Sequence, residues 1–323
     1  MRRQSTLATL AAITLLAVPA IAGSAGASGP RISEHDRIVA HWTPARLKAA
    51  VPRDYVRTPS GLVPKARPGG GGGTSTGSSW NGGGRILQAS GKVYFEMGGG
   101  AYVCSGSVAN DSRSGYSLVL TAGHCAYDET NRAFATNWLF IPNFDGAPTF
   151  TCANTVYGCW TAKALVVHNG FASAGGFNTQ ATVYDFAFAV VGPGGKSNGQ
   201  LDATVGSFPI AYSGVSAGNT LYAFGYPAAG KYHGNDLTYC NGPIFTDTNN
   251  SNLTWGMVCG MTGGSSGGPW LSSFNASTGV GTLSSLNSYG YSGVKNMYGP
   301  KFNSNTQAVY NAANGATSNT IVN

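Results

Sequence analysis

Short runs of β-forming residues, separated by Gly, Asn and Ser, fill the chain from Trp80 to about Tyr298. The 323 residues include 48 glycines, and only 10% of them are charged, unlike the Lys- and Glu-rich composition of helical proteins. This pattern favours an all-β fold with many turns, typical of barrels and sandwiches. The expected strands are Val93–Glu96, Ser117–Ala122, Trp138–Pro142, Ala164–His168 and Thr182–Val191 in a first group, then Thr220–Tyr226, Trp255–Cys259, Pro269–Ser272 and the residues near Tyr289.

The stretch Gly263–Pro269, Gly-Gly-Ser-Ser-Gly-Gly-Pro, places the hydroxyl of Ser266 between glycines, which adopt backbone angles closed to other residues. Such a loop can expose the hydroxyl while its N–H groups converge on one point, where an oxyanion would form. A flexible Gly/Ser linker is the other interpretation of this stretch alone. The flanking residues disfavour a linker, because Cys259 and Met261 precede the stretch and Trp270 follows it.

Two upstream motifs supply a base and a carboxylate. His124 lies in Thr-Ala-Gly-His-Cys after an apolar run, and Asp185 begins Asp-Phe-Ala-Phe-Ala-Val-Val. Acyl transfer needs a nucleophile, a base that accepts its proton, and a group that holds the base in the right tautomer. We expect Ser266, His124 and Asp185 to fill these roles. Ser265 is the alternative nucleophile, but Gly-Gly-Pro follows Ser266 directly.

Thr-Ala-Gly-His-Cys together with Gly-Ser-Ser-Gly-Gly-Pro resembles the trypsin/chymotrypsin-like serine endopeptidases, and in particular their secreted bacterial branch, over roughly residues 80 to 314. The chain order His, Asp, Ser is also that of the chymotrypsin type. The resemblance implies two six-stranded antiparallel barrels, about residues 80–192 and 193–323, with the active site between them. It also implies an oxyanion hole made by the backbone N–H groups of Gly264 and Ser266. A C-terminal helix is expected over Asn305–Ala313.

The sequence departs from the family pattern near the nucleophile. The family's usual aspartate before the nucleophile is replaced by Ser265, and the aspartate of the trypsin branch six residues before the nucleophile is replaced by Gly260, followed by Met261. Without an acidic residue there, cleavage after Lys or Arg is not expected. We place the opposite wall of the specificity pocket at Ser288 and Tyr289. Glutamate-specific bacterial relatives use a histidine in that wall, and no histidine occurs after position 233, which disfavours glutamate preference.

The six cysteines predict a disulfide framework if the chain is exported, and six cysteines permit fifteen pairings. Proximity in the sequence favours Cys104–Cys125, Cys152–Cys159 and Cys240–Cys259, and the first pair also matches the family. A metal site is the alternative, but the sequence has no CxxC pair and no clustered histidines. We expect no metal and no cofactor.

The N-terminus predicts export. A basic start, Met1-Arg2-Arg3, followed by the apolar run Leu7–Ile21, is typical of a secretory signal peptide, here over residues 1–27. A membrane anchor is the alternative, but the run is short and rich in alanine. The arginine pair is compatible with twin-arginine export, yet the large apolar pair that usually follows is missing, so ordinary secretion is favoured.

Residues 28–79 predict a pro-segment followed by a linker, and the peptidase domain then covers residues 80–323. Ser28–Arg67 contains many charged residues and several prolines, and a short helix is expected near Leu47. The Gly- and Ser-rich residues 69–79 cannot pack a core. A disordered tail without a role is the alternative interpretation.

The formal net charge of +7 raises the question of a nucleic-acid partner. Ten of the 19 basic residues precede the linker and would be removed with the pro-segment: Arg2, Arg3, Arg31, Arg37, Arg46, Lys48, Arg53, Arg57, Lys65 and Arg67. No cluster of Lys and Arg is left in the remainder, so we expect no nucleic-acid partner.

The sequence therefore predicts a secreted, extracellular and monomeric serine endopeptidase, made as a precursor. It would hydrolyse protein or peptide substrates through an acyl-enzyme intermediate, without a membrane association after removal of the signal. Two alternatives stay open, a catalytically silent binding protein on the same fold and an esterase that uses the same triad. An α/β-hydrolase esterase is disfavoured by the motif order and by the lack of a strand–elbow–helix pattern.

Overall fold

The computed structural model describes residues 1, 32–58, 61–64, 77–144 and 151–323. The chain divides into two units, Met1–Ser33 and Glu34–Asn323, and the fold described below is that of the second. The expected signal peptide and most of the expected linker lie outside the described residues. No helix within the described ranges is long and apolar enough to cross a membrane.

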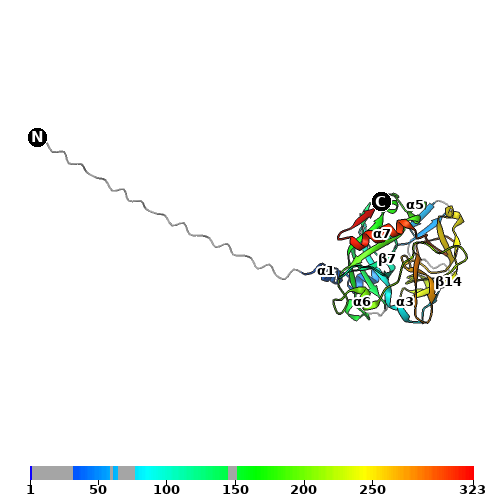
Figure 1. Cartoon of the computed structure of the whole chain (residues 1–323), viewed down its shortest axis with the longest axis horizontal. Coiled ribbons are helices and arrows are strands. Elements are labelled where there is room, and N and C mark those ends of the chain that lie inside the picture. The colour runs from blue at the N-terminus through cyan, green and yellow to red at the C-terminus, as the bar shows by residue number, and fades with distance from the viewer. Residues whose placement is uncertain (2–31, 59–60, 65–76, 145–150) are drawn as a thin grey trace. The chain divides into compact units, whose positions relative to one another are not determined.

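The first half of the fold is a closed barrel of six antiparallel strands. These are β5 (Ser90–Met97), β6 (Gly100–Ala109), β7 (Ser117–Thr121), β10 (Thr136–Pro142), β11 (Trp160–His168) and β12 (Ala187–Val191). The pairing order is β6-β5-β10-β11-β12-β7, and β7 pairs again with β6, which closes the barrel. Figure 1 shows these strands in cyan and green.

Two barrel strands are buried along their whole length. Every residue of β7 and β12 is buried. The helix α6 (Leu201–Val205) packs on β7, and α7 (Ser304–Gly315) packs on β12, so neither strand has a face in water. Strands covered on both faces have continuous apolar sequences rather than alternating ones. The apolar runs of β7 and β12 therefore allowed both strands to be predicted from the sequence.

The second half consists of two sheets that adjoin at two places, and within this half their strands pair antiparallel. One sheet has the order β18 (Val280–Leu286), β17 (Pro269–Asn275), β13 (Thr220–Gly225), β14 (Thr238–Pro243) and β4 (Ser78–Ser79). The other contains β15 (Phe245–Thr246), β16 (Thr254–Val258), β20 (Asn296–Pro300) and β19 (Tyr289–Tyr291). Close approaches of β14 to β16 and of β18 to β20 join the sheets. The expected all-β, chymotrypsin-like fold with a C-terminal helix is confirmed.

The list of expected strands lacks β6, β14, β18 and β20, and two of the local predictions differ from the structure. Thr182–Val191 was expected to be one strand, but Thr179–Val183 forms helix α5, and the strand begins only at Ala187. The side chain of Asn178 accepts a hydrogen bond from Ala181 N and caps this helix. Ser78–Ser79 were assigned to the linker, but they pair with Thr238 and Tyr239 of β14 and therefore belong to the second half.

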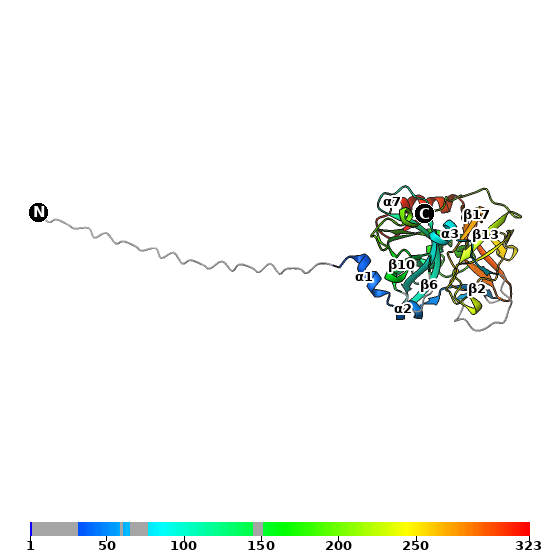
Figure 2. The ribbon, with the colours of Figure 1, turned by 90° about the horizontal axis from the view of Figure 1, so that it is seen from below.

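The described residues 34–58 and 61–64, called the N-terminal segment below, pack against both halves. The helices α1 (Glu34–His41) and α2 (Pro44–Ala49) bury Ile38 and Leu47, and the short helix expected near Leu47 is present. Two short strands follow, β1 (Val51–Pro52) beside β6 and β2 (Tyr55–Thr58) beside β19, and β3 (Gly61–Pro64) pairs with β2. Figure 2 shows α1 and α2 beside the first half and β2 beside the second.

The three disulfides expected from sequence proximity are formed, Cys104–Cys125, Cys152–Cys159 and Cys240–Cys259. The first joins β6 to the short 3-10 helix η1 (Gly123–Cys125). The last joins the two sheets of the second half next to their contact between β14 and β16.

Candidate active site

His124 lies in η1, directly after strand β7 of the first barrel. The hydroxyl of Thr121, the last residue of β7, donates to the carbonyl of Ser105 at 2.8 Å and holds the end of the strand against β6. The disulfide from Cys125 to Cys104 fixes the other side of the turn. The imidazole of His124 is therefore held from both sides, and it is fully buried.

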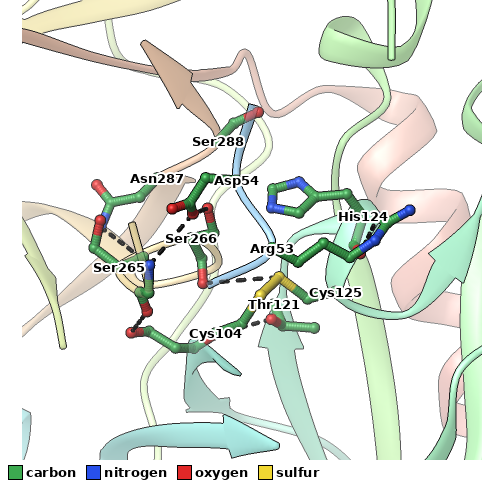
Figure 3. Close-up of a disulfide and its surroundings, with 12 residues drawn as sticks. Arg53, Asp54, Cys104, Thr121, His124, Cys125, Ser265, Ser266, Asn287 and Ser288 are labelled. Carbon is green, nitrogen blue, oxygen red and sulfur yellow. Dashed lines mark hydrogen bonds between the residues drawn. A yellow bond between two sulfur atoms is a disulfide. The ribbon is translucent and has the colours of Figure 1, made fainter. Parts of the chain in front are cut away.

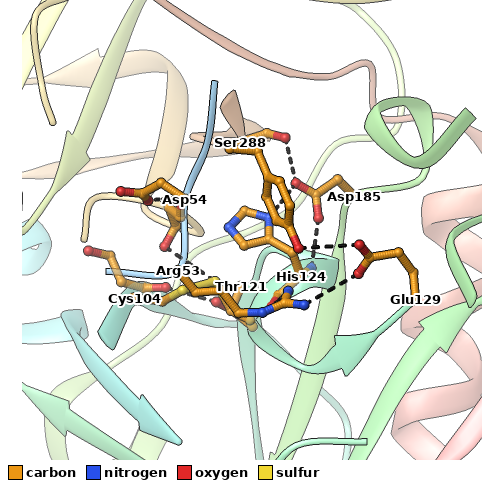
Figure 4. A network of polar contacts seen from close by, with 12 residues as sticks. Arg53, Asp54, Cys104, Thr121, His124, Glu129, Asp185 and Ser288 are labelled. Atoms are coloured by element: carbon orange, nitrogen blue, oxygen red, sulfur yellow. Dashed lines mark hydrogen bonds and ion pairs between the residues drawn. A yellow bond between two sulfur atoms is a disulfide. The ribbon is translucent and has the colours of Figure 1, made fainter. Parts of the chain in front are cut away.

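Asp185 contacts His124 through both of its carboxylate oxygens. Oδ2 lies 2.8 Å from Nδ1 of His124, and Oδ1 accepts the backbone N–H of His124 at 2.8 Å. The hydroxyl of Ser288 also donates to Oδ2, at 2.5 Å (Figure 4). A carboxylate on Nδ1 keeps the proton on that nitrogen, so Nε2 presents a lone pair that can accept another proton.

The turn that carries Ser266 requires glycine at two positions. Gly264 has a φ of +95° and Gly267 a φ of +81°, in the region that other residues rarely adopt. A Cβ on Gly267 would also lie 2.3 Å from Thr121 Oγ1, so this residue brings the turn close to the end of β7. The glycines therefore serve a tight, closely packed turn, and the linker interpretation of this stretch is wrong.

Neutral hydrogen bonds hold the same turn. The hydroxyl of Ser265 donates to the carbonyl of Thr262 at 2.8 Å, and the side-chain amide of Asn287 donates to the carbonyl of Ser265 at 3.0 Å. From the first barrel, the backbone N–H of Ser105 donates to the carbonyl of Ser266 at 2.7 Å. Figure 3 shows Ser266 beside the Cys104–Cys125 disulfide.

The hydroxyl of Ser266 contacts a residue that sequence reasoning did not identify. It donates to Oδ1 of Asp54, in the N-terminal segment, at 2.9 Å, and the backbone N–H of Gly264 donates to the same oxygen at 3.3 Å. Nε2 of His124 is buried and has no hydrogen-bond partner among the described residues. The structure thus joins His124 to Asp185, whereas Ser266 is hydrogen-bonded to Asp54.

The neighbours of Asp54 also lie against His124. The ring of Tyr55 meets the imidazole edge-on at 5.4 Å between centroids, and it stacks on Phe177 at 3.9 Å. Arg53 donates to the carbonyl of His124 and forms an ion pair with the buried carboxylate of Glu129 at 3.5 Å. Figure 4 shows Arg53 between His124 and Glu129. No sequence motif marks these residues, because their partners are far away along the chain.

A cavity of about 520 Å³ adjoins Ser266 and is lined by all four residues expected at the specificity pocket: Gly260, Met261, Ser288 and Tyr289. Asp54 and Tyr55 also line it, and Asp54 is the one acidic residue in the described lining. The hydroxyls of Tyr289 and Tyr291 donate to the buried carboxylate of Asp247 at 2.6 and 2.8 Å. Burial, with the hydrogen bond to Asp247, raises the pKa of Tyr289. The sequence did not identify Asp247 as a residue that holds the Tyr289 wall of the pocket.

The nitrogen and sulfur atoms of His124, Cys104 and Cys125 lie within 4.8 Å of one another, which is a spacing that could hold a metal ion. The two sulfurs are bonded to each other in the disulfide. A disulfide offers no thiolate, so this cluster does not provide the ligands of a zinc-type site.

No protein-family model matches the sequence, and no curated protein matches it. Solved structures do match, among them the protease Anisep from Arthrobacter nicotinovorans and AL20, a thermostable serine protease from an extremophilic microorganism. Anisep is 37% identical over 71% of this chain and 96% of its own, with a TM-score of 0.61. AL20 is 35% identical over 72% of this chain and 99% of its own, with a TM-score of 0.62.

A Glu endopeptidase shares the fold at 20% identity, over 76% of this chain and 99% of its own, with a TM-score of 0.55. The fold, the buried histidine–aspartate pair and the serine turn beside it are those of a chymotrypsin-like serine protease. The chain belongs to the chymotrypsin-like serine protease family. Its three disulfides fit an extracellular location.

Proposed function

We propose that the chain is a secreted serine endopeptidase in which His124, Asp185 and Ser266 form the catalytic triad. The observation that carries this proposal is the 2.8 Å contact between Nδ1 of His124 and Asp185, both fully buried, next to the glycine turn of Ser266. This pairing leaves Nε2 available as the general base.

In the proposed reaction, Ser266 Oγ attacks the scissile carbonyl carbon while His124 Nε2 takes the hydroxyl proton. The carbonyl oxygen becomes an oxyanion, which accepts hydrogen bonds from the backbone N–H groups of Gly264 and Ser266. The intermediate collapses to an acyl-enzyme, and the leaving amine receives the proton from His124. A water molecule, deprotonated by His124, then hydrolyses the acyl-enzyme by the same steps.

The position of Asp54 supports the assignment of the oxyanion hole. Its Oδ1 atom, which carries negative charge, accepts hydrogen bonds from Gly264 N and from the Ser266 hydroxyl. An oxyanion formed on a substrate carbonyl would be stabilised by the same kind of donor. A substrate can take this position only after Asp54 has left it, so the active form has lost or displaced this part of the N-terminal segment.

The lining of the cavity beside Ser266 supports the proposed preference against Lys and Arg. Gly260 and Met261 carry no charge, and Tyr289 presents an aromatic wall that Asp247 holds in place. A cationic side chain would find no carboxylate there once Asp54 has left, so its desolvation would not be compensated. Lys295 also lines the cavity, and its positive charge further disfavours a cationic side chain at the cleavage position.

The test is to treat the processed protein with a serine-directed fluorophosphonate and to map the modified residue by mass spectrometry, alongside hydrolysis of casein and of lipid esters. We expect modification of Ser266 and hydrolysis of casein. The Ser266→Ala variant serves as the control and should show neither. Absence of labelling would favour a catalytically silent binding protein, and hydrolysis of lipid esters without that of casein would favour an esterase.

A further inference from the structure

We propose that Arg53-Asp54-Tyr55, called the plug below, inhibits the intact chain by filling the nucleophile, the oxyanion hole and an adjacent acidic subsite at once. This inference rests on the proposed function, because it assigns inhibition to residues that contact Ser266 and His124. Three separate contacts carry it, one for each residue of the plug.

Asp54 withholds the nucleophile. The Ser266 hydroxyl donates its proton to Asp54 Oδ1 at 2.9 Å, so that the proton is not directed at His124 Nε2. The backbone N–H of Gly264 is engaged by the same oxygen. The fit is close, since a Cβ on Gly263 would lie 1.6 Å from Asp54 Oδ2. The Ser266 hydroxyl and the backbone N–H of Gly264, the oxyanion donor, are therefore both bonded to Asp54.

The group held at Ser266 is a side-chain carboxylate and not a peptide carbonyl. A carboxylate is a poor acceptor for a nucleophile because its negative charge opposes attack.

The strands β1 and β2 hold the plug in this placement. β1 pairs in parallel with β6 of the first barrel, and β2 pairs in parallel with β19, with Tyr55 opposite Tyr289. The plug consequently bridges the two halves without presenting a scissile bond.

Tyr55 covers the general base. Its ring meets the imidazole of His124 edge-on and stacks on Phe177, whose ring also meets His124 edge-on at 5.5 Å. With these rings in place the His124 side chain is 0% exposed. The Tyr55 hydroxyl donates to Glu129 at 3.2 Å, which fixes the ring over the histidine. Substrate and water are thereby kept from Nε2.

Arg53 anchors the plug in an acidic subsite formed by Asp128 and Glu129. Its guanidinium lies 3.5 Å from Glu129 Oε2 and 3.9 Å from Asp128 Oδ1, and only 11% of its side chain is exposed. The Glu129 side chain is 1% exposed, and its Oε2 has no hydrogen-bond partner in the described part of the chain. A buried carboxylate without a cation is strongly unfavourable. This subsite therefore selects a basic residue beside Asp54.

The experiment uses the intact full-length chain and measures the rate at which a fluorophosphonate labels Ser266. The test variants are Asp54→Ala and Arg53→Ala. The matched controls are Asp36→Asn and Lys48→Ala, which change an acidic and a basic residue exposed on α1 and α2. We expect the test variants to be labelled about 10- to 100-fold faster than the wild type, as the loss of charged hydrogen bonds implies, and the controls to match the wild type.

Asp54→Asn keeps the size of the side chain and should give an intermediate rate, which keeps the test valid if Asp54→Ala folds poorly. Equal labelling of the wild type and of both folded test variants would overturn the plug while leaving the proposed function intact. Labelling absent from every form, including chains cut within residues 65–76, would overturn the proposed function and the plug with it.

Mass spectrometry of the incubated wild-type chain gives an independent measurement. We expect the peptide bonds from Arg53 to Tyr55 to stay intact while the intact chain persists. Rapid cleavage at either bond would mean that this stretch docks as a substrate, and the plug would then be excluded.

Discussion

The hydroxyl of Ser266 lies 2.9 Å from Oδ1 of Asp54, although 212 positions separate the two residues in the sequence. The contact joins the glycine turn to the N-terminal segment. It leaves Nε2 of His124 without a hydrogen-bond partner in the described structure, while Asp185 still holds Nδ1. In the described arrangement, Asp185 orients His124 as a base, but the neighbouring Ser266 hydroxyl donates its proton to Asp54 and not to His124.

The triad is expected to act as a unit. His124→Ala and Ser266→Ala in the processed protein should each lower turnover of a peptide substrate by roughly 10⁴-fold, and the double variant should lose little more. The reason is that removal of either group already abolishes activation of the nucleophile. Steady-state hydrolysis and a thermal melt, which checks folding, are the measurements. Retention of a tenth of the activity in either variant, free of contaminating protease, contradicts the assignment.

Ser288→Ala should lower kcat by about 10- to 100-fold in the processed protein, as expected for loss of one hydrogen bond to a charged group. The hydroxyl of Ser288 donates to Asp185 Oδ2, the oxygen that contacts His124 Nδ1. Ser284→Ala is the matched control, since its buried hydroxyl bonds to Ser272 instead. Equal kinetic constants for the two variants would show that the Ser288 hydroxyl does not support the aspartate.

Replacing both Cys104 and Cys125 by serine should lower the free energy of unfolding by about 3 kcal/mol. The bond closes a sequence separation of 21 residues, and a loop of this size gives that value in the chain-entropy model. Activity should fall further than stability alone explains, because Cys125 adjoins His124. Urea unfolding measures the first effect, and kcat at a temperature well below the melting point measures the second. A variant with unchanged stability would contradict this prediction.

Lys92 should make stability depend on pH. Burial lowers its pKa from 10.5 to about 7, and its Nζ donates to the carbonyl of Gly234 at 3.1 Å. Because the pKa is lower in the folded chain, the unfolded chain binds more protons between about pH 7 and 10.5, so this group's contribution to stability rises with pH across that window. Below about pH 7 both states are protonated and the contribution is constant.

Lys92→Met should therefore flatten the profile, relative to the wild type, by on the order of 3–5 kcal/mol between pH 7 and 10.5. Urea unfolding at a series of pH values measures the difference. Lys196→Met is the control, because Lys196 is exposed. Parallel profiles for Lys92→Met and the wild type would mean that Lys92 is not titrating in this window.

Activation should not require a free N-terminal ammonium group. Ser265, where the family has aspartate, carries no charge, and its hydroxyl donates to Thr262 while Asn287 donates to its carbonyl. A buried ammonium beside it would lack a counter-ion. Chains that begin between Thr74 and Gly77 keep β4 and should acylate at similar rates, whether or not the terminus is acetylated. A hundredfold loss on acetylation would show that the ammonium does find a partner.

Much of the site was visible in short stretches of sequence. Ser266 lies among glycines that the turn requires, since Gly264 and Gly267 have positive φ values. Asp185 precedes an apolar run that becomes the fully buried strand β12. The disulfides followed from proximity along the chain. Each of these inferences depends on backbone freedom, burial pattern or spacing within a few residues, and a sequence displays those properties directly.

Other features depended on partners far away in the chain. Thr182 lies in a helix because Asn178 caps it and Asn250, 68 positions away, bonds to its hydroxyl. Ser78 and Ser79 became a strand because β14 offers them an edge. Asp54 reaches Ser266 only when strands of both halves hold the segment between them. Local conformational preference and the pattern of apolar residues can be read from short stretches of sequence. The choice of a distant partner depends instead on which surfaces the folded halves bring together and bury. Only the tertiary structure decides that choice.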